Sequence, residues 1–297
     1  MQEIPVESLK AEQNENSGKK DAVENTAERG QGDAAEEEAL RLSVGYATAA
    51  AEEISGDTAI SSGLPDGSLA LILSDGMGKG IRAAAESRAV ARRLRKNLKS
   101  GMRPAFAIKE VNRYMLACEE AQAKCDDMRN CRPAIQECEK KPEPLQQARA
   151  ARCSSAAAGE AECFATVDLL IIDRNAAKAK FYKMGAASSF LLRNGKVKKF
   201  EQAALPIGII PEVRLNHIAV RLKAGDIVVM VSDGVTEADC ADGSDGAWLH
   251  ELLESRTAAE LAHLSARRLA GEILGEAILR YADRERDDLT VAVVKIL

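Results

Sequence analysis

Two apolar runs in this chain stop at the same three residues, Ser-Asp-Gly. The first run, LALILSDGMGKG, begins at Leu69, and the second, DIVVMVSDGVTEA, begins at Asp226. Short apolar runs that end at glycine are typical of buried strands. The pattern therefore predicts that Asp75 and Asp233 lie at the ends of two strands.

Further acidic residues lie at expected strand edges. Asp57 follows a Ser-Gly pair, and Asp287 and Asp288 directly precede the last apolar run. A single aspartate at a turn usually caps or bends the chain. As a group, however, oxygen ligands suit Mg²⁺ or Mn²⁺ better than zinc, and the chain has only three histidines. Two such ions can activate a water for displacement at phosphorus.

The glycine-rich turn after Asp75 fits no nucleotide-binding loop. A Walker A loop requires glycine where Leu73 stands and Ser or Thr where Gly80 stands, and the G-x-G-x-G spacing differs from a dinucleotide fingerprint. Asp75 would also repel a bound phosphate unless a cation lay between them. The residues therefore favour phosphate chemistry that uses a metal.

The charge balance argues against a nucleic-acid ligand. The 297 residues carry a formal net charge of -5, and we expect the basic cluster at 92–96 to be the solvated face of a helix. No apolar run approaches the roughly 20 residues that span a bilayer, and residues 1–20 lack a signal-peptide core. We therefore expect a cytoplasmic chain, or the cytosolic part of a membrane protein, with no membrane segment of its own.

Apolar periodicity divides the chain into a polar leader, 1–39, expected to be disordered or helical, and one folded domain, 40–297. Grouped hairpins, with Asn194-Gly195 as the strongest turn signal, predict antiparallel sheets packed against helices. The expected helices are 81–99, 104–118, 247–255 and 258–282. The expected strands are 42–48, 69–74, 165–172, 178–184, 189–193, 197–201, 217–222, 227–231 and 289–296.

Residues 119–162 have the character of a Cys-rich helical insertion. Six of the seven cysteines fall between 118 and 163, and the spacings from Cys118 to Cys138 match no zinc pattern but fit one stripe of a helical hairpin. The odd total and the missing export signal disfavour a disulfide framework. Buried or half-buried thiols on helices are therefore favoured over a metal or redox site.

Six motifs occur in the order and approximate spacing of a known family: SGD, SDGMGKG, GAASSFLLRNGKV, LPIGII, LKAGDIVVMVSDGVTEA and DDLT. Over about residues 43–296, apart from the insertion, the chain resembles the PPM-type bacterial serine/threonine phosphatases. It is most similar to the phosphatase region of the stage II sporulation protein E family. The resemblance implies an α+β fold, an α-β-β-α sandwich of two mainly antiparallel sheets flanked by helices.

The resemblance also implies a centre of two Mn²⁺ or Mg²⁺ ions between the sheets. Asp168, in the stretch AECFATVDL, would be structural rather than a ligand. Asp287 matches the family pattern better than its neighbour Asp288. The implied metal ligands, whose carboxylates are also the expected catalytic groups, are Asp57, Asp75, the carbonyl of Gly76, Asp233 and one of Asp287 and Asp288.

The implied activity is hydrolysis of phosphoserine or phosphothreonine in a protein, with metal ions activating the attacking water. For the sporulation branch the substrate would be a phosphorylated anti-anti-sigma factor, and full-length members carry a membrane-spanning region. A homodimer is left open. The alternative is a phosphatase-like module that binds a regulatory partner without turnover, but all four acidic positions are present, which disfavours it. A calcium-binding structural domain would need a D-x-D-x-D-G loop, which the sequence lacks.

Overall fold

Ten strands in the described part of the chain form two five-stranded antiparallel sheets. The computed structural model describes residues 39–130, 163–239, 246–282 and 284–297. The first sheet has the strand order β1-β10-β9-β6-β7 and the second β2-β3-β4-β5-β8. The strands are β1 Leu42–Ala49, β2 Asp57–Gly63, β3 Leu69–Asp75, β4 Val167–Asp173, β5 Lys178–Met184, β6 Ser189–Arg193, β7 Lys196–Phe200, β8 Ile218–Arg221, β9 Ile227–Val231 and β10 Leu289–Ile296.

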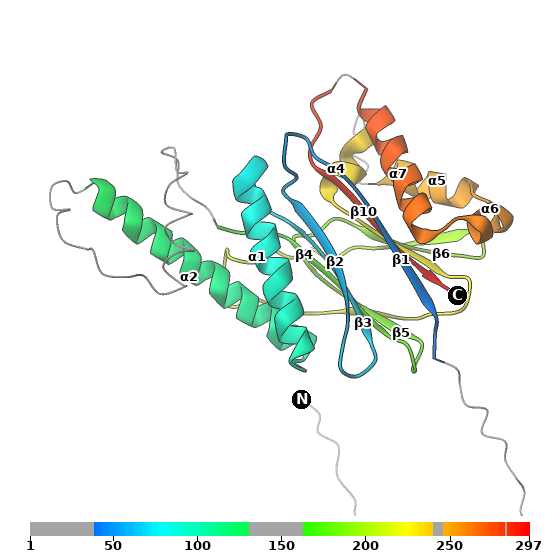
Figure 1. Cartoon of the computed structure of the whole chain (residues 1–297), viewed down its shortest axis with the longest axis horizontal. Coiled ribbons are helices and arrows are strands. Elements are labelled where there is room, and N and C mark those ends of the chain that lie inside the picture. The colour runs from blue at the N-terminus through cyan, green and yellow to red at the C-terminus, as the bar shows by residue number, and fades with distance from the viewer. Residues whose placement is uncertain (1–38, 131–162, 240–245, 283) are drawn as a thin grey trace, which may run out of the picture. The chain divides into compact units, whose positions relative to one another are not determined.

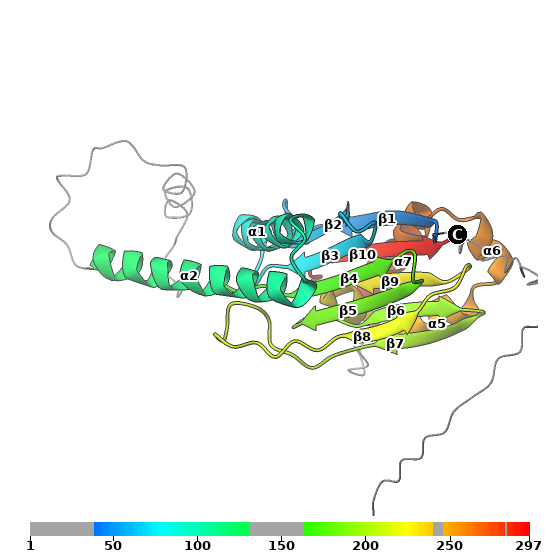
Figure 2. The same ribbon diagram turned by 90° about the horizontal axis from the view of Figure 1, so that it is seen from below.

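Helices cover the outer face of each sheet, so the layers run helix, sheet, sheet, helix (Figures 1 and 2). This arrangement confirms the expected α-β-β-α sandwich. None of the described helices combines the length and apolar character that crossing a bilayer requires. The second sheet carries α1 Gly80–Lys99 and α2 Pro104–Asn130, and the first carries α5 Ala247–Ser255, α6 Ala258–His263 and α7 Ala266–Tyr281. The short helix α4 Asp233–Thr236 and the 3-10 helix Glu237–Asp239 follow β9.

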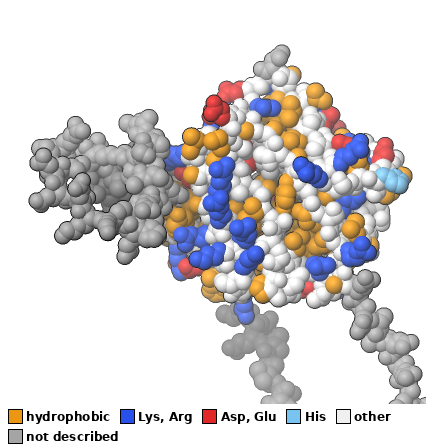
Figure 3. Space-filling model, viewed as in Figure 1, with side chains coloured by type: hydrophobic (Ala, Val, Ile, Leu, Met, Phe, Trp, Pro, Cys, Tyr) orange, Lys and Arg blue, Asp and Glu red, His pale blue; other side chains and the backbone are white. Residues whose placement is uncertain are grey.

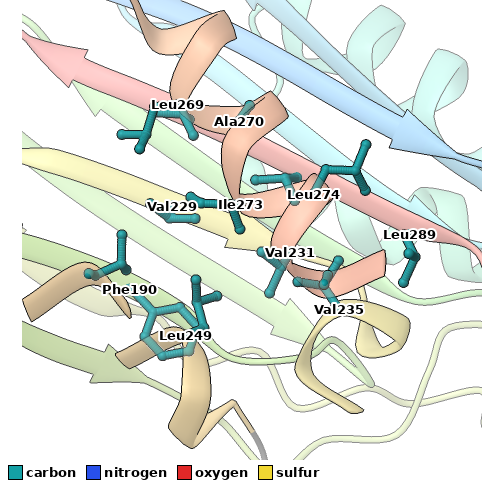
Figure 4. Close-up of a cluster of buried hydrophobic side chains, with 14 of the residues drawn as sticks. Phe190, Val229, Val231, Val235, Leu249, Leu269, Ala270, Ile273, Leu274 and Leu289 are labelled. Atoms are coloured by element: carbon teal, nitrogen blue, oxygen red, sulfur yellow. The ribbon is translucent and has the colours of Figure 1, made fainter. Parts of the chain in front are cut away.

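Three clusters of buried apolar side chains join the four layers. One cluster joins α1 and α2 to the second sheet and includes Leu94 and Ile72. Another joins α7 to the first sheet, where Ile273 lies over Val229 (Figure 4). The third fills the space between the sheets and includes Phe181. The central strands of each sheet are therefore buried on both faces, which explains why β3, β4, β9 and β10 are nearly continuous apolar runs.

The structure contains one strand, β2, that was not expected from the sequence. Its sequence, DTAISSG, contains only two apolar residues and ends in Ser-Ser-Gly, so its composition favours a loop more than a strand. It is a strand because every residue from Asp57 to Gly63 pairs in register with β3. This tertiary pairing overrides the local preference, and it places Asp57 in the sheet.

Two expected helices have different limits. The expected helix 258–282 is divided, because Ser265 is extended and caps α7 by accepting a hydrogen bond from the Arg268 N–H. The expected helix 104–118 continues to Asn130, so the first part of segment 119–162 is helical. Residues 1–38 of the leader and residues 131–162 of the insertion lie outside the described residues.

The hairpin signal at Asn194-Gly195 is confirmed. These two residues join β6 to β7 and have φ angles of 51° and 73°. The positive φ at both central positions is the geometry that the right-handed twist of a two-residue hairpin requires. The turn therefore fixes the register of β6 against β7. Ser189, the first residue of β6, faces the space between the sheets.

The expectation that the cysteines are buried or half-buried on helices is confirmed only in part. Cys118 is half-buried on α2. Cys163 is buried beneath the same helix but precedes β4 and belongs to no helix, so that expectation is wrong for this residue. The remaining cysteine side chains lie outside the described residues.

The basic cluster at 92–96 is a solvated helix face, as expected. Arg92, Arg93, Arg95 and Lys96 are all exposed on α1, and Figure 3 shows Lys and Arg side chains gathered over this helix. The Arg93 guanidinium carbon lies 3.6 Å from the centre of the Tyr114 ring, which ties α1 to α2 through a cation–π contact.

We expect Gly45→Ala to destabilise the packing of α7 against β1. A Cβ at Gly45 would lie 2.1 Å from the backbone nitrogen of Arg267, so the helix or the strand must move. The free energy of unfolding, measured by urea denaturation, should fall by about 1–3 kcal/mol. Gly63→Ala is the matched control, because nothing lies within 4 Å of that position. Equal stability of the two variants would contradict the close approach.

Candidate metal centre

The space between the two sheets is apolar in its middle and polar at one end. Side chains along a strand alternate between its two faces, so the residue two positions beyond a core residue faces the same space. Both sheets place polar groups at the same end in this way. From the second sheet, Asp75 follows Leu73, Asp168 precedes Leu170 and Lys183 follows Phe181, and from the first sheet Ser189 precedes Leu191, Ser232 follows Met230 and Thr290 precedes Ala292.

Asp57 is a buried member of the expected ligand set. It begins β2, lies directly opposite Asp75 in the register of β2 and β3, and is 7% exposed. Neither of its carboxylate oxygens accepts a hydrogen bond of normal geometry. Burial raises the pKa of Asp57 to about 7, and the hydroxyls of Ser232 and Thr290 lie near enough to oppose this increase in part. The carboxylate therefore lacks the partners that a buried charge requires.

Asp75 has an even more strongly perturbed carboxyl group. Burial is the largest cause, and the negative charges of Asp57, Asp233 and Asp287 add to it, so that the pKa of Asp75 rises to about 9. The backbone of Asp75 is fixed by Thr166, whose hydroxyl accepts a hydrogen bond from the Asp75 N–H at 2.9 Å. The sequence predicted this strand end correctly, and the structure adds the reason for its rigidity.

Asp233 reaches the same region from the other sheet. It is half-buried and is the first residue of α4, the short helix that follows β9. Its Oδ1 accepts a hydrogen bond from the Gly234 N–H at 2.8 Å. A carboxylate at a helix N-terminus also interacts favourably with the helix dipole. Asp233 therefore lies across the sandwich from Asp57 and Asp75, and its charge raises the pKa of both.

Asp287 and Asp288 have different surroundings. Asp288 is 4% exposed, and its two oxygens accept hydrogen bonds from the N–H groups of Ala51 and Gly56 at 2.7 and 2.6 Å. Asp287 is exposed, and its charge acts on Asp75. Since backbone donors occupy both oxygens of Asp288, we infer that it holds the loop before Asp57, and Asp287 is the better candidate ligand.

Gly76, directly after Asp75, is in close contact with α1. A Cβ at this position would lie 2.0 Å from the Ala83 carbonyl oxygen in the second turn of α1. Its N–H donates to the Gly56 carbonyl at 3.3 Å, and it forms an isolated bridge with Ala165. Only glycine leaves room for this contact, so the carbonyl proposed as a ligand is positioned by helix packing.

Of the expected ligands, Asp75 and Asp233 line one cleft, and Asp57 and Asp287 lie near enough to act on Asp75 electrostatically. Among the described residues, no three His, Cys, Asp or Glu side chains form a group that would hold an ion by themselves. The Asp57 oxygens accept no hydrogen bond of normal geometry, and the pKa values of Asp57 and Asp75 are raised. Both features fit a cation, because positive charge would stabilise the ionised carboxylates. The cleft is lined by Leu73, Asp75, Thr166, Asp168, Gly185, Ala186, Ala187, Val231, Ser232 and Asp233.

Several polar residues around the carboxylates did not emerge from the sequence. Thr166 fixes Asp75, and the Ser232 hydroxyl accepts a hydrogen bond from the Thr290 N–H at 2.9 Å. The Tyr281 hydroxyl donates to the Gly234 carbonyl at 2.7 Å, and burial raises its pKa to about 12. The signal that would have found Ser232 and Thr290 is the alternation of inward-facing residues, continued past the last apolar one.

Solved structures identify this sandwich as the fold of PP2C-type phosphatase domains. The PP2C phosphatase domain with a fragment of the regulatory domain of the cell fate determinant SpoIIE from Bacillus subtilis matches with a TM-score of 0.65 and 29% identity, over 87% of this chain and 64% of that chain. RsbX in complex with magnesium matches with a TM-score of 0.53 and 14% identity, over 88% and 96% of the two chains. The likeness to RsbX is one of fold.

The family follows from sequence. The family model for stage II sporulation protein E matches residues 65–297. Stage II sporulation protein E of Bacillus subtilis (strain 168) is 31% identical over 258 residues, which cover 86% of this chain and 26% of that protein. The Priestia megaterium protein of the same name is 30% identical over 243 residues, covering 82% and 34%. The chain belongs to the stage II sporulation protein E family and spans about a quarter to a third of these relatives.

We expect the metal-free protein to lose stability as the pH rises from about 4 to about 9. The folded state binds the protons of Asp57 and Asp75 more tightly than the unfolded chain does, because their pKa values rise from 3.8 to about 7 and about 9. Their neutral forms are thus fully compatible with folding below pH 4, and each ionisation above it destabilises the fold. Urea denaturation in EDTA across this range measures the effect.

The variant Asp75→Asn should flatten this pH dependence, and Mn²⁺ added at pH 8 should restore the stability of the unaltered chain. Asp66→Asn is the control, because Asp66 lies in the exposed turn between β2 and β3. A free energy of unfolding that stays constant from pH 5 to pH 9 in EDTA would contradict the buried, uncompensated carboxylates.

Proposed function

We propose that this chain is a metal-dependent protein phosphatase that hydrolyses phosphoserine or phosphothreonine. The observation that carries the proposal is the Asp57 carboxylate, buried opposite Asp75 with neither oxygen in a hydrogen bond of normal geometry. A buried anion needs a compensating positive charge, and a divalent cation supplies one. Within a PP2C-type fold of the stage II sporulation protein E family, this requirement supports phosphate-ester hydrolysis.

The proposed cofactors are two Mn²⁺ or Mg²⁺ ions. The groups that would hold them, Asp57, Asp75, the Gly76 carbonyl, Asp233 and Asp287, are all oxygen donors, which hard cations prefer. RsbX, which shares the fold, is in complex with magnesium. When bound, such ions would polarise the phosphoryl group and lower the pKa of the attacking water. The chain itself orients the ligands, since Thr166 fixes the backbone of Asp75.

A phosphorylated protein is the proposed substrate. Three large apolar side chains are exposed: Met77, Leu205 and Ile209. Leu205 and Ile209 flank Ile207, whose backbone pairs with Ala165, next to the cleft. Exposed apolar side chains grouped near a site favour a protein partner. We propose a phosphorylated anti-anti-sigma factor as that partner, as the resemblance to the sporulation branch implies, acting in sigma-factor control in the cytoplasm.

The second candidate is a domain that binds a phosphorylated partner without turnover. This reading would gain support if a carboxylate at the polar end were replaced or engaged elsewhere. Asp288 is engaged by backbone donors, but Asp57, Asp75, Asp233 and Asp287 are present and act on one another electrostatically. Turnover is therefore the property that separates the two candidates.

We expect Asp75→Asn and Asp233→Asn each to lower Mn²⁺-dependent hydrolysis of a phosphoserine peptide by roughly a hundredfold or more. Each change removes one negative charge from the proposed ligand set but keeps the side-chain volume, so the fold should persist. Phosphate release measured at saturating Mn²⁺, with circular dichroism as the check on folding, tests this expectation.

Asp66→Asn is the matched control and should retain full activity, since its carboxylate serves only the turn before β3 through the Ser68 N–H. Near-normal turnover by the Asp75 or Asp233 variant would contradict the proposed metal centre. An unaltered chain that binds the phosphopeptide but never releases phosphate would favour the second candidate.

A further inference from the structure

A buried ion pair lies beside the cleft and has no part in the proposed metal ligation. Lys183 on β5 and Asp168 on β4 are direct cross-strand neighbours, 0% and 1% exposed at the side chain. The Lys183 ammonium lies 2.6 Å from Asp168 Oδ2, and the same oxygen accepts a hydrogen bond from the Ser189 hydroxyl at 2.7 Å. The pair thus joins both sheets at the polar end of the sandwich.

The Lys183 ammonium also holds the turn that follows its own strand. It donates to the Ala187 carbonyl at 2.5 Å. Residues 185–187 of this turn line the cleft, as does Asp168. One ammonium group therefore connects two parts of the cleft wall, the start of β4 and the turn after β5.

The opposite side of this turn rests on the segment between β7 and β8. The Gly185 N–H donates to the Ala204 carbonyl at 3.0 Å, and a Cβ at Gly185 would lie 2.5 Å from Pro206. Gly185 has a φ of 62°, a conformation that side chains other than glycine rarely adopt. The turn is therefore fixed by backbone packing on one side and by Lys183 on the other.

A fully buried ion pair contributes little net stability to a fold. Removing two charges from water costs about as much as their attraction returns, and apolar residues of the same volume often serve as well. Neighbouring positions on the same faces are apolar, with Leu170 and Phe181 two residues away. What an apolar pair would not provide is the hydrogen bond to Ala187, which fixes the position of the cleft wall.

We propose that Lys183, neutralised by Asp168, is a positioning residue that holds the turn 185–187 as the wall against which the phosphorylated segment of a substrate lies. The proposal rests on the proposed function for the identity of the substrate. Lys183 is fully buried, so it acts through the turn and not by contact with the phosphate. A turn released from Lys183 would leave the carboxylates in place but present a less ordered surface to the substrate.

The test replaces the pair with apolar residues, Asp168→Leu together with Lys183→Met. Two measurements follow: amide hydrogen exchange at residues 185–188, and kinetics with a phosphoserine peptide at saturating Mn²⁺. We expect exchange to become at least tenfold faster and KM to rise roughly tenfold, with a smaller change in kcat, as a misplaced binding surface predicts. The thermal midpoint should stay close to that of the unaltered chain.

The matched control removes a second ion pair that lies outside the cleft, Arg193→Met together with Asp226→Asn. The Arg193 guanidinium contacts Asp226 at 2.5 Å, and Asp226 is buried. This variant should lose stability without a change in KM or in exchange at 185–188. If the apolar variant does not fold, Asp168→Asn with Lys183→Gln keeps the pair polar but uncharged and takes its place in both measurements.

Unchanged exchange at 185–188 would overturn the proposal, as would an unchanged KM in an active enzyme. Failure of the proposed function looks different: the unaltered chain would then show no Mn²⁺-dependent hydrolysis. In that case the exchange measurement alone decides whether Lys183 holds the turn, with slow exchange in the variant counting against it.

Discussion

The facing carboxylates of Asp57 and Asp75 are the constraint on which the rest of the site depends. Like charges directly opposite each other on antiparallel strands destabilise a sheet, and burial strengthens their repulsion by lowering the local dielectric constant. The pairing of β2 with β3 nevertheless fixes them at this place. The fold therefore requires positive charge beside these two carboxylates. Protons supply it below their raised pKa values of about 7 and about 9, and divalent cations would supply it in place of those protons.

The sequence predicted the half of this pair that ends an apolar strand and missed the strand that carries the other half. Asp75 closes LALILSD, whose composition identifies a strand, whereas Asp57 opens DTAISSG, whose strand exists only through its partner. Local patterns report local preference, and β2 has little. For the same reason the two Asp-Gly turns were found, but the facing of Asp57 and Asp75 was not, since it depends on register.

The polar end of the sandwich has a simple origin in strand alternation. Phe181 and Met230 fill the space between the sheets. The residues two positions further along the same strands, Lys183 and Ser232, face the same space but are polar. The alternation is present in the sequence, but which alternate residues face the other sheet depends on which face of each sheet the helices cover. Nearly continuous apolar strands hide that choice, and so the sequence did not distinguish Asp168 and Ser189 as partners.

Three glycines show how closely the carboxylates are tied to the elements around them. A side chain at Gly76 would meet the Ala83 carbonyl of α1, one at Gly56 would approach the Asp288 carboxylate, and one at Gly234 would meet the Asp288 carbonyl. Since Gly76 and Gly234 each adjoin an expected ligand, the backbone around the ligands is in direct contact with α1 and with the loop before β10. Displacement of either element by a fraction of an ångström would therefore change the distances between the carboxylates, because no flexible side chain lies between them to absorb it.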